Sequence, residues 1–249
     1  MHPDTIPTSF PGRRSVRWGK RNQEVAEWIR LHPSTIASVL PWFRDLPKPG
    51  ETEREEELRE KHAFRRAYHA VNKLYEQGRI KYQWSIRVNA EGRPVHVYCG
   101  WACKMDTLKS HELPLTYFCR AYKDFEWVRG TSAIQRIYKE TEPDAVMIGD
   151  KTRFVEYDSA LEREGTYKEH MTRYKGTNTR ILIVVPWFRD DRIEQLIGWG
   201  ESVNHLAAYT TLDRVMATPY GQIWRDSTGK VSGLTKPSGK PSNKPGEKL

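Results

Sequence analysis

The chain has 249 residues, 37% of them hydrophobic and 29% charged, which is enough to bury one large core or two smaller ones. The 41 Lys and Arg residues outnumber the 32 Asp and Glu residues, and the resulting net charge of +9 favours an acidic polymer such as DNA as partner. No apolar stretch is long enough to span a bilayer, and three cysteines do not suit a disulfide framework, so we expect a cytoplasmic protein without membrane contact.

Both ends of the chain are predicted to be flexible. Residues 1–20 are polar and Pro-rich and contain four basic residues, which indicates a flexible basic arm. Residues 227–249 are rich in Gly, Ser, Pro and Lys, which predicts a disordered basic tail. Five Lys against one Glu within 230–249 account for four of the nine net positive charges, so the charge excess of the remainder is moderate.

Three helices followed by a β-hairpin are predicted within residues 21–104. Val25, Trp28 and Ile29 follow helical spacing, and a second short helix is expected after Pro33. A long helix pattern runs over 53–77, and alternating residues on either side of a turn at 89–92 predict the hairpin. This order is that of a winged helix-turn-helix, in which a helix enters the major groove and the hairpin lies along the DNA backbone.

The predicted DNA contacts are polar and basic positions away from the apolar stripe of the long helix and on the polar face of the hairpin. They are Arg65, Arg66, Asn72, Lys73, Lys81, Arg87 and Arg93. A module of the same fold that binds a protein is the alternative.

An α/β pattern fills residues 105–226. Strands are predicted at 145–148, 153–158 and 180–185, with short edge elements at 210–213 and 222–224. Residues 107–128 are predicted to form a helix and then a short strand. Further helices are predicted at 159–175 and 193–204, and a loop at 131–141. The chain is therefore expected to be α+β overall, with a mixed sheet flanked by helices after the N-terminal module.

Three carboxylates are expected to meet at one edge of this sheet. Asp144 begins one strand, and Glu156 and Asp158 lie two residues apart on the next, so the last two share a face. Asp144 and Glu156 are oxygen ligands of the kind that suit Mg²⁺ or Mn²⁺, and such an ion activates water for phosphodiester hydrolysis. Lys168 and Lys175 on the following helix are candidates to stabilise the developing charge. A solvated sheet edge is the alternative interpretation.

The spacing from Pro143-Asp144 to Glu156-x-Asp158 resembles the PD-(D/E)XK nuclease core. The usual motif has lysine where this chain has Asp158. Some branches of that superfamily carry the lysine on the next helix, where Lys168 and Lys175 stand here. In relatives, the lysine is often near the place of His170.

Five segments together narrow the resemblance. HELPLTYFCRAY, EPDAVMI, FVEYDSALEREGTYKEHMTRYK, RILIVVP and TTLDRVMATPYGQIWRD are similar in order and spacing to the replication-relaxation family of bacterial mobile elements. That resemblance implies a winged helix joined to a restriction-endonuclease-like domain. It also implies a role in plasmid replication or conjugative mobilisation, with metal-dependent DNA nicking as one activity.

Two non-catalytic functions remain open from the sequence. One is an accessory protein that binds double-stranded DNA and recruits a relaxase or a replication initiator. The other is a transcriptional regulator. The oligomeric state is not indicated, since no heptad pattern is present.

Other residues allow further interpretations. A zinc site from His96, Cys99, Cys103, His111 and Cys119 is disfavoured by irregular spacing, and buried thiols explain the cysteines better. Aromatic residues such as Trp84, Trp101, Trp127, Tyr82 and Tyr98 are expected to pack in the core more than to stack on bases. His111 and Glu112, at a predicted helix start, are candidates to line the nuclease-like cleft.

Overall fold

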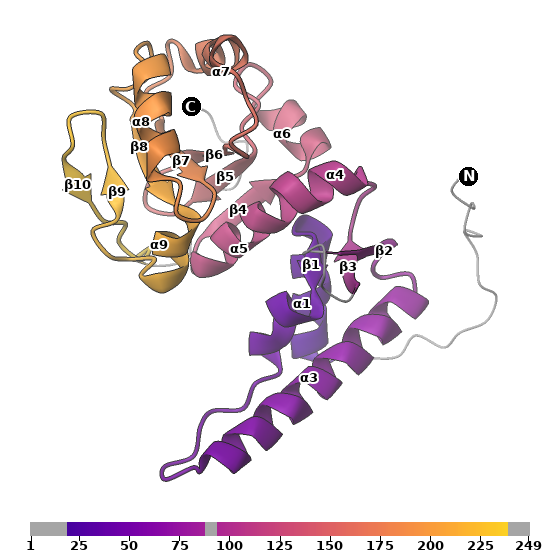
Figure 1. Cartoon of the computed structure of the whole chain (residues 1–249). Helices are drawn as coiled ribbons and strands as arrows, with labels where there is room; N and C mark the ends of the chain where they lie inside the picture. Colours follow the sequence, from indigo (N-terminus) through magenta and orange to yellow (C-terminus); the bar gives the residue numbers. More distant parts are fainter. Residues whose placement is uncertain (1–18, 88–93, 239–249) are drawn as a thin grey trace.

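In a computed structural model that describes residues 19–87 and 94–238, the chain is a mixed α and β protein (Figure 1). A three-stranded sheet belongs to the N-terminal module, residues 19–99, and a seven-stranded sheet to the α/β module, residues 105–238. Arg93, one of the predicted DNA contacts, lies outside the described residues.

The N-terminal module consists of short helices, one long helix and a small antiparallel sheet. In chain order its elements are α1 (Lys20–Leu31), β1 (Ser34–Thr35), α2 (Ile36–Val39), η1 (Leu40–Trp42), α3 (Glu53–Glu76), β2 (Tyr82–Ile86) and β3 (Val95–Cys99). The sheet order is β1-β3-β2, so the earliest strand pairs with the last. Residues from α1, α2, α3 and β3 form one core, in which Ile29, Val71 and Tyr98 are fully buried.

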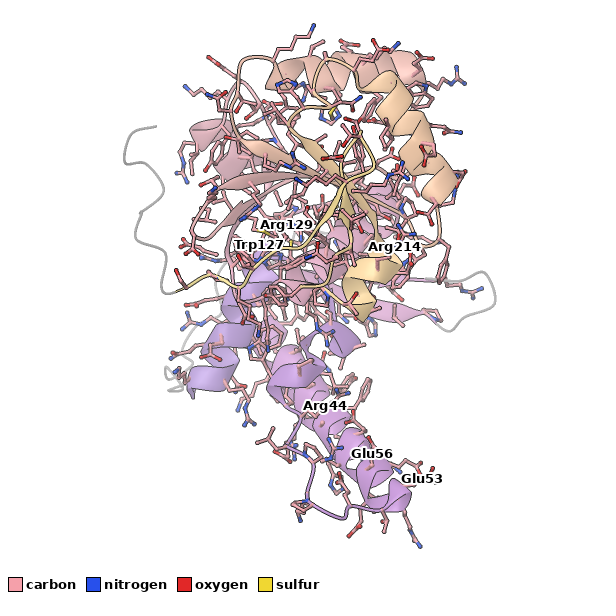
Figure 2. The ribbon with its side chains drawn as sticks, turned by 90° about the vertical axis from the view of Figure 1, so that its left-hand side faces the viewer. Arg44, Glu53, Glu56, Trp127, Arg129 and Arg214 are labelled. Carbon is pink, nitrogen blue, oxygen red and sulfur yellow. The ribbon has the colours of Figure 1, made fainter. Side chains whose placement is uncertain are left out.

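Helix α3 is buried along only half of its length. A capping box between Thr52 and Glu55 begins the helix, and its buried residues Ala63, Ala67, Val71 and Leu74 lie from the middle of the helix onward. The first half projects away from the rest of the molecule, with Glu53 and Glu56 near its tip (Figures 1 and 2). Ion pairs with the preceding loop support it, among them Arg59 to Glu51 at 3.0 Å.

The α/β module begins with α4 (Met105–Thr107), the π-helical turn η2 (Leu108–Glu112) and α5 (Leu113–Ala121). The elements that follow are β4 (Glu126–Arg129), α6 (Thr131–Ile137), β5 (Ala145–Ile148), β6 (Arg153–Tyr157), α7 (Glu164–Met171), η3 (Thr172–Tyr174), β7 (Arg180–Val185), α8 (Asp190–Trp199), β8 (Ala207–Thr211), α9 (Leu212–Ala217), β9 (Trp224–Arg225) and β10 (Val231–Ser232). The strand order is β10-β9-β8-β7-β6-β5-β4. Strands β6, β7 and β8 are parallel to one another and the other pairings are antiparallel.

Helices cover both faces of the large sheet. Alternate residues of β5, β6 and β7 enter two separate cores, because successive side chains of a strand point to opposite faces. One core holds Leu115, Phe118 and Cys119 of α5 with the buried residues of α9, and the other holds buried apolar residues of α6, α7 and α8. Six consecutive buried or half-buried residues in β7 follow from this double coverage.

The hairpin β2–β3 packs on both modules. One face contributes Tyr98 to the N-terminal core, while Ile86, Val97 and Cys99 form a separate cluster with Leu108 and Leu113 of the α/β module. Trp28 of α1 also packs against the core beneath α5. The two modules are therefore joined by apolar contacts as well as by the chain.

Several predicted boundaries are wrong. Residues 131–137 form α6 where a loop was expected, and the helix after β6 begins at Glu164 because residues 158–163 form a loop. The segment around 210–211 belongs to β8, which is an inner strand between β7 and β9. The hydrophobic patterns in these segments are too short to distinguish a helix from a loop, or an inner strand from an edge strand, by sequence.

The prediction of disorder from residue 227 onward is also wrong for residues 227–238. Strand β10 pairs with β9, and Leu234 is 9% exposed in the core beneath α5. The Ser238 hydroxyl donates a hydrogen bond to Asp150 at 2.8 Å. The composition of residues 227–238 does not reveal this order, because the contacts that hold them involve only a few residues, chiefly Leu234 and the β9–β10 pairing.

A buried ion pair fixes the end of β6 to the start of α8. Arg192 donates to both carboxylate oxygens of Asp158, at 2.6 and 2.9 Å, and also to the Glu162 carbonyl oxygen and the Gln195 side chain. The two side chains are 4% and 3% exposed. The loop between β6 and α7 is held against α8 by this bidentate pair.

We expect Asp158→Ala to lower the free energy of unfolding by roughly 3–5 kcal/mol, because it leaves the Arg192 charge buried and unpaired. Urea unfolding measures the change. The matched control is Glu164→Gln, which breaks the exposed ion pair with Lys168 and should change the free energy of unfolding far less. Equal effects of the two substitutions would contradict a structural role for Asp158.

Candidate carboxylate–histidine site

The register of β5 and β6 brings Asp144 and Glu156 together. Ala145 pairs with Val155, and Val146 with Phe154. One further step of the same antiparallel register places Asp144 opposite Glu156, on the face that packs against α6, α7 and α8. The backbone N–H of Tyr157 donates to Asp144 Oδ2 at 2.8 Å, which holds that carboxylate against the end of β6.

Two histidines and a tyrosine surround the two carboxylates. His111 Nε2 lies 2.9 Å from Asp144 Oδ2, and its ring meets the Tyr157 ring edge-on with centroids 5.8 Å apart. On Glu156, the Tyr174 hydroxyl donates a hydrogen bond to Oε1, and His170 Nε2 lies 3.6 Å from Oε2. The cluster thus draws on η2, β5, β6, α7 and η3.

A buried arginine extends the cluster towards the N-terminal module. Arg129, at the end of β4, has a side chain that is 1% exposed and donates to Glu112 Oε2 at 2.5 Å. Its Nη1 lies 3.0 Å from both the Thr116 hydroxyl and His32 Nδ1. Glu112 Oε1 is 3.3 Å from His111 Nδ1, and His111 contacts Asp144. Polar contacts therefore run without a break from Arg129 to Asp144. Figure 2 places Arg129 where the two modules meet.

The pKa shifts follow from this arrangement. Burial, and then the neighbouring Asp144 carboxylate, raise the pKa of Glu156 well above its ordinary value. Burial would also raise the pKa of Asp144, but His111 and the Tyr157 amide lower it. Glu156 is therefore the carboxylate that holds a proton most readily, and Asp144 the one that stays ionised.

The histidines at the two ends of the network shift in opposite directions. Burial would lower the pKa of His111, but the Asp144 carboxylate and then Glu112 raise it to about 10. Burial, and then the Arg129 guanidinium, lower the pKa of His32 well below its ordinary value. At neutral pH, His111 is accordingly a cation and His32 is neutral.

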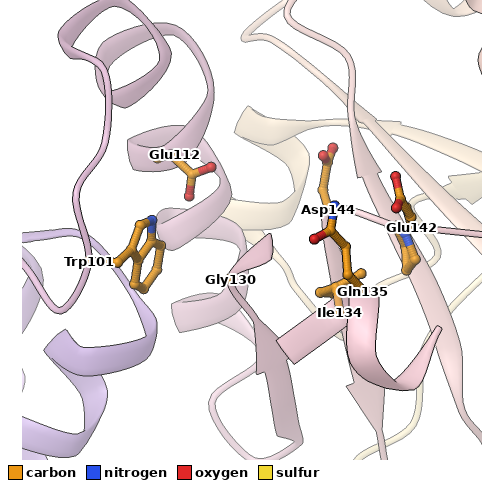
Figure 3. A pocket seen from close by; sticks show the side chains of 8 residues that line it. Trp101, Glu112, Gly130, Ile134, Gln135, Glu142 and Asp144 are labelled. Atoms are coloured by element: carbon orange, nitrogen blue, oxygen red, sulfur yellow. The ribbon is translucent and has the colours of Figure 1, made fainter. Parts of the chain in front are cut away.

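A small pocket opens beside Asp144. Its volume is about 140 Å³, and Trp101, Glu112, Gly130, Ile134, Gln135, Glu142, Pro143 and Asp144 line it (Figure 3). Trp101 comes from the segment that connects the modules, so the pocket lies at their junction. Glu142 at its rim is 3.6 Å from Arg173.

The carboxylate pair fits the chemistry of a hard divalent cation. Mg²⁺ commonly binds one or two carboxylates and completes its shell with water and phosphate oxygens. Burial and the neighbouring Asp144 carboxylate raise the pKa of Glu156, so an ion bound between the two carboxylates would have to displace the proton that Glu156 holds. Within residues 19–87 and 94–238, no three His, Cys, Asp or Glu side chains are grouped closely enough to share an ion.

The other predicted catalytic residues do not join this pair. Asp158 shares the face of Glu156 but is engaged by Arg192. Lys168 pairs with Glu164 at 2.5 Å on the exposed side of α7, and Lys175 is exposed beyond η3. His170, one turn of helix from Tyr174, is the basic residue of that segment that reaches Glu156.

The predicted DNA contacts of the N-terminal module fall into two groups. Arg65, Lys73, Lys81 and Arg87 are exposed. Arg66 is half-buried and donates to the Phe43 carbonyl oxygen and to Asp45, while Asn72 accepts a hydrogen bond from the Tyr98 hydroxyl at 2.6 Å. Asn72 therefore supports the module internally.

A groove on the same module gathers basic side chains. Its volume is about 590 Å³, and Gly19, Arg21, Asn22, Phe43, Arg65, Arg66, His69 and Ala70 line it. The Arg21 guanidinium lies over the Phe43 ring, 5.8 Å from the centroid. The groove runs between the start of α1 and the second half of α3.

Sequence reasoning identified Asp144, Glu156, His111 and Glu112 but missed Arg129, Tyr174 and His32. Arg129 and His32 are 97 positions apart, and neither belongs to a local motif. Tyr174 lies on the apolar stripe of a predicted helix, so its hydroxyl contact with Glu156 leaves no signal in the pattern.

The histidines and cysteines considered for zinc do not form a metal site among the described residues. Burial raises the pKa of Cys99 and of Cys119 to about 12, so both thiols stay protonated. His111 belongs to the carboxylate cluster instead.

Comparison with protein-family models, curated proteins and solved structures finds no match to this chain. Within the described residues, no helix combines the length and apolar character needed to cross a membrane.

The raised pKa of His111 predicts a pH-dependent stability. Its contribution is fully present below the unfolded value near 6.5 and is lost as the pH rises towards about 10. In the wild type, the free energy of unfolding should fall by at most roughly 1.4 kcal/mol per pH unit across that window. We expect His111→Gln to remove this decline. Denaturant unfolding of both proteins at several pH values measures it. The exposed His205→Gln is the control, and a wild-type-minus-mutant difference that stays constant from pH 6 to 10 would contradict the assignment.

Proposed function

We propose that this protein is a DNA-binding protein of a plasmid or integrative element, acting in replication or conjugative mobilisation from the cytoplasm. Its N-terminal module is a winged helix that contacts double-stranded DNA, and its α/β module is a restriction-endonuclease-like domain. The observation that carries the proposal is the N-terminal topology: three helices, a hairpin, and a β1-β3-β2 sheet in which the first strand pairs with the last.

The basic groove supports a DNA contact on this module. Arg21 and Arg65 lie on its rim with His69, and Lys73 continues the same face of α3 one turn further on. Arginine and lysine side chains arranged along a groove suit the phosphate backbone. The groove is also lined by Asn22, whose amide is able to pair with phosphate or a base edge.

Charge restricts how α3 meets DNA. Its projecting first half carries Glu53, Glu55, Glu56, Glu57 and Glu60, which repel phosphates. Among the described residues of the hairpin, the inner ones pack against both modules, which leaves the outer face of β2 and β3 for DNA. DNA is thus expected to approach the second half of α3 and the start of α1, where the basic groove lies.

We expect Arg65→Ala to weaken binding to duplex DNA similarly for all sequences. The slope of log affinity against log salt concentration should fall in magnitude by about 0.9, as for one lost phosphate contact. Fluorescence anisotropy at several salt concentrations measures both. Arg54→Ala is the matched control, because Arg54 is an exposed arginine on the acidic half of the same helix. Identical losses in the two variants would indicate a general charge effect and count against the groove.

The contact between Asp144 and Glu156 favours a second function, metal-dependent nicking of DNA. Mg²⁺ or Mn²⁺ bound there would stabilise charge on a scissile phosphate and activate a water molecule. The surrounding residues already hold protons at defined atoms: His111 at Nε2 beside Asp144, and Tyr174 at its hydroxyl beside Glu156. Ion binding must ionise Glu156, so it should release protons and strengthen as the pH rises.

We expect relaxation of a supercoiled plasmid in Mn²⁺ or Mg²⁺, blocked by EDTA and lost in Glu156→Gln and Asp144→Asn. Lys168→Ala should retain the activity, because Lys168 is paired with Glu164 on the exposed face of α7. Agarose electrophoresis separates nicked from supercoiled plasmid. If the wild type retards DNA in a gel but leaves the plasmid intact, the non-catalytic function stands: an accessory protein that recruits a relaxase or replication initiator.

A further inference from the structure

A buried polar contact joins the two modules at the end of α1. His32 directly follows α1, and its Nδ1 lies 3.0 Å from Nη1 of Arg129 at the end of β4. His32 is 1% exposed, and so is the Arg129 side chain. The Trp28 ring stacks on the His32 ring with centroids 3.9 Å apart. The contact is therefore sealed from water, in contrast to the exposed hydrogen bond from Arg120 to the Ala37 carbonyl oxygen, which also crosses the junction.

Only an unprotonated His32 can make this contact. A guanidinium carries five N–H donors and no acceptor, so Nδ1 of the histidine must accept through its lone pair. The ring is then neutral, with its proton on Nε2. A second proton on the ring would turn Nδ1 into a donor and would place two cations 3.0 Å apart.

The titratable groups that face this pair come from η2 and α5. Glu112 of η2 already accepts from Arg129, through Nη2, at 2.5 Å. The Cys119 thiol of α5 is near Arg129, and its pKa of about 12 keeps it neutral. Among the residues that the structure describes, no carboxylate lies within ion-pair distance of His32. Burial, and then the Arg129 guanidinium, accordingly lower the pKa of His32 well below its ordinary value.

We propose that His32 is an acid-sensitive joint between the two modules. When it takes up a proton, its contact with Arg129 breaks and the end of α1 loosens from β4. The apolar cluster of the hairpin with Leu108 and Leu113 does not titrate, so the opening is local and the modules stay together. The inference depends on this contact alone, whatever ligand the N-terminal module binds.

The direction and size of the effect follow from the linkage between protonation and opening. His32 titrates near its ordinary pKa of 6.5 in the open form and well below it in the closed form. The closed form is therefore fully favoured above pH 6.5, and acid favours the open form. The open population should rise about tenfold for each pH unit below 6.5, until the pKa of the closed form is reached.

Hydrogen–deuterium exchange of the full chain, read by mass spectrometry from about pH 7.5 to about pH 5, tests the joint. The matched variant is His32→Gln, whose amide oxygen accepts from Arg129 but does not titrate. Comparison at equal pH cancels the pH dependence of the exchange chemistry. We expect the ratio of wild-type to variant exchange rates at the end of α1 to rise about tenfold per pH unit below 6.5. The same ratio for α7 and α8 should stay constant, and His205→Gln, at an exposed position, should behave as the wild type does.

A ratio at the end of α1 that stays constant with pH would overturn the proposal, because His32 would then not control the opening. An equal rise in α7 and α8 would also overturn it, since the whole molecule would be unfolding. Should His32→Gln fail to fold, NMR titration of the His32 ring in the wild type decides the question. A pKa well below 6.5, with the Trp28 indole signal following the same titration, supports the joint. An ordinary pKa, or a Trp28 signal that does not follow, overturns it.

Discussion

The buried guanidinium of Arg129 is the interaction on which the arrangement of this molecule depends. An arginine removed from water at the junction of two modules needs partners on every side, and Glu112, Thr116 and His32 supply them. Glu112 belongs to η2, Thr116 to α5, and His32 directly follows α1, so this one charge fixes three segments relative to the sheet. Glu112 then orients His111, and His111 reaches Asp144. The geometry of the carboxylate site is in this way connected to the N-terminal module.

The site balances its own charges. Protonated His111 offsets Asp144, Arg129 offsets Glu112, and burial favours the neutral form of Glu156. A site of this kind is stable without an added ion, in contrast to a cluster of bare carboxylates. The same balance makes cation binding a proton exchange, because a second positive charge beside Asp144 competes with His111.

Alternation and a tight turn were enough to predict that Asp144 and Glu156 would meet, because antiparallel register follows from the turn between two short strands. The start of a helix is less constrained. Residues 158–163 form a loop in which Ala160 adopts a left-handed conformation with φ of 61°, and this moves α7 onward so that His170 faces the site. Arg129, His32 and Trp101 met through tertiary packing between distant segments, which single-sequence periodicity does not encode. Asp158 was placed on the correct face, but its partner Arg192 lies 34 residues away.

The hairpin β2–β3 belongs to both cores, and this limits how the protein can have been assembled from parts. Its inner residues contact α3 on one side and Leu108 and Leu113 on the other. At Gly100, a β-carbon would lie 2.4 Å from the Arg30 carbonyl oxygen, so even the connecting segment is fitted to α1. A recombination event that exchanged the N-terminal module alone would leave Ile86, Val97 and Cys99 without their partners. Inheritance of the two modules as one unit, with residues 100–129 carried along, is the arrangement that preserves both cores.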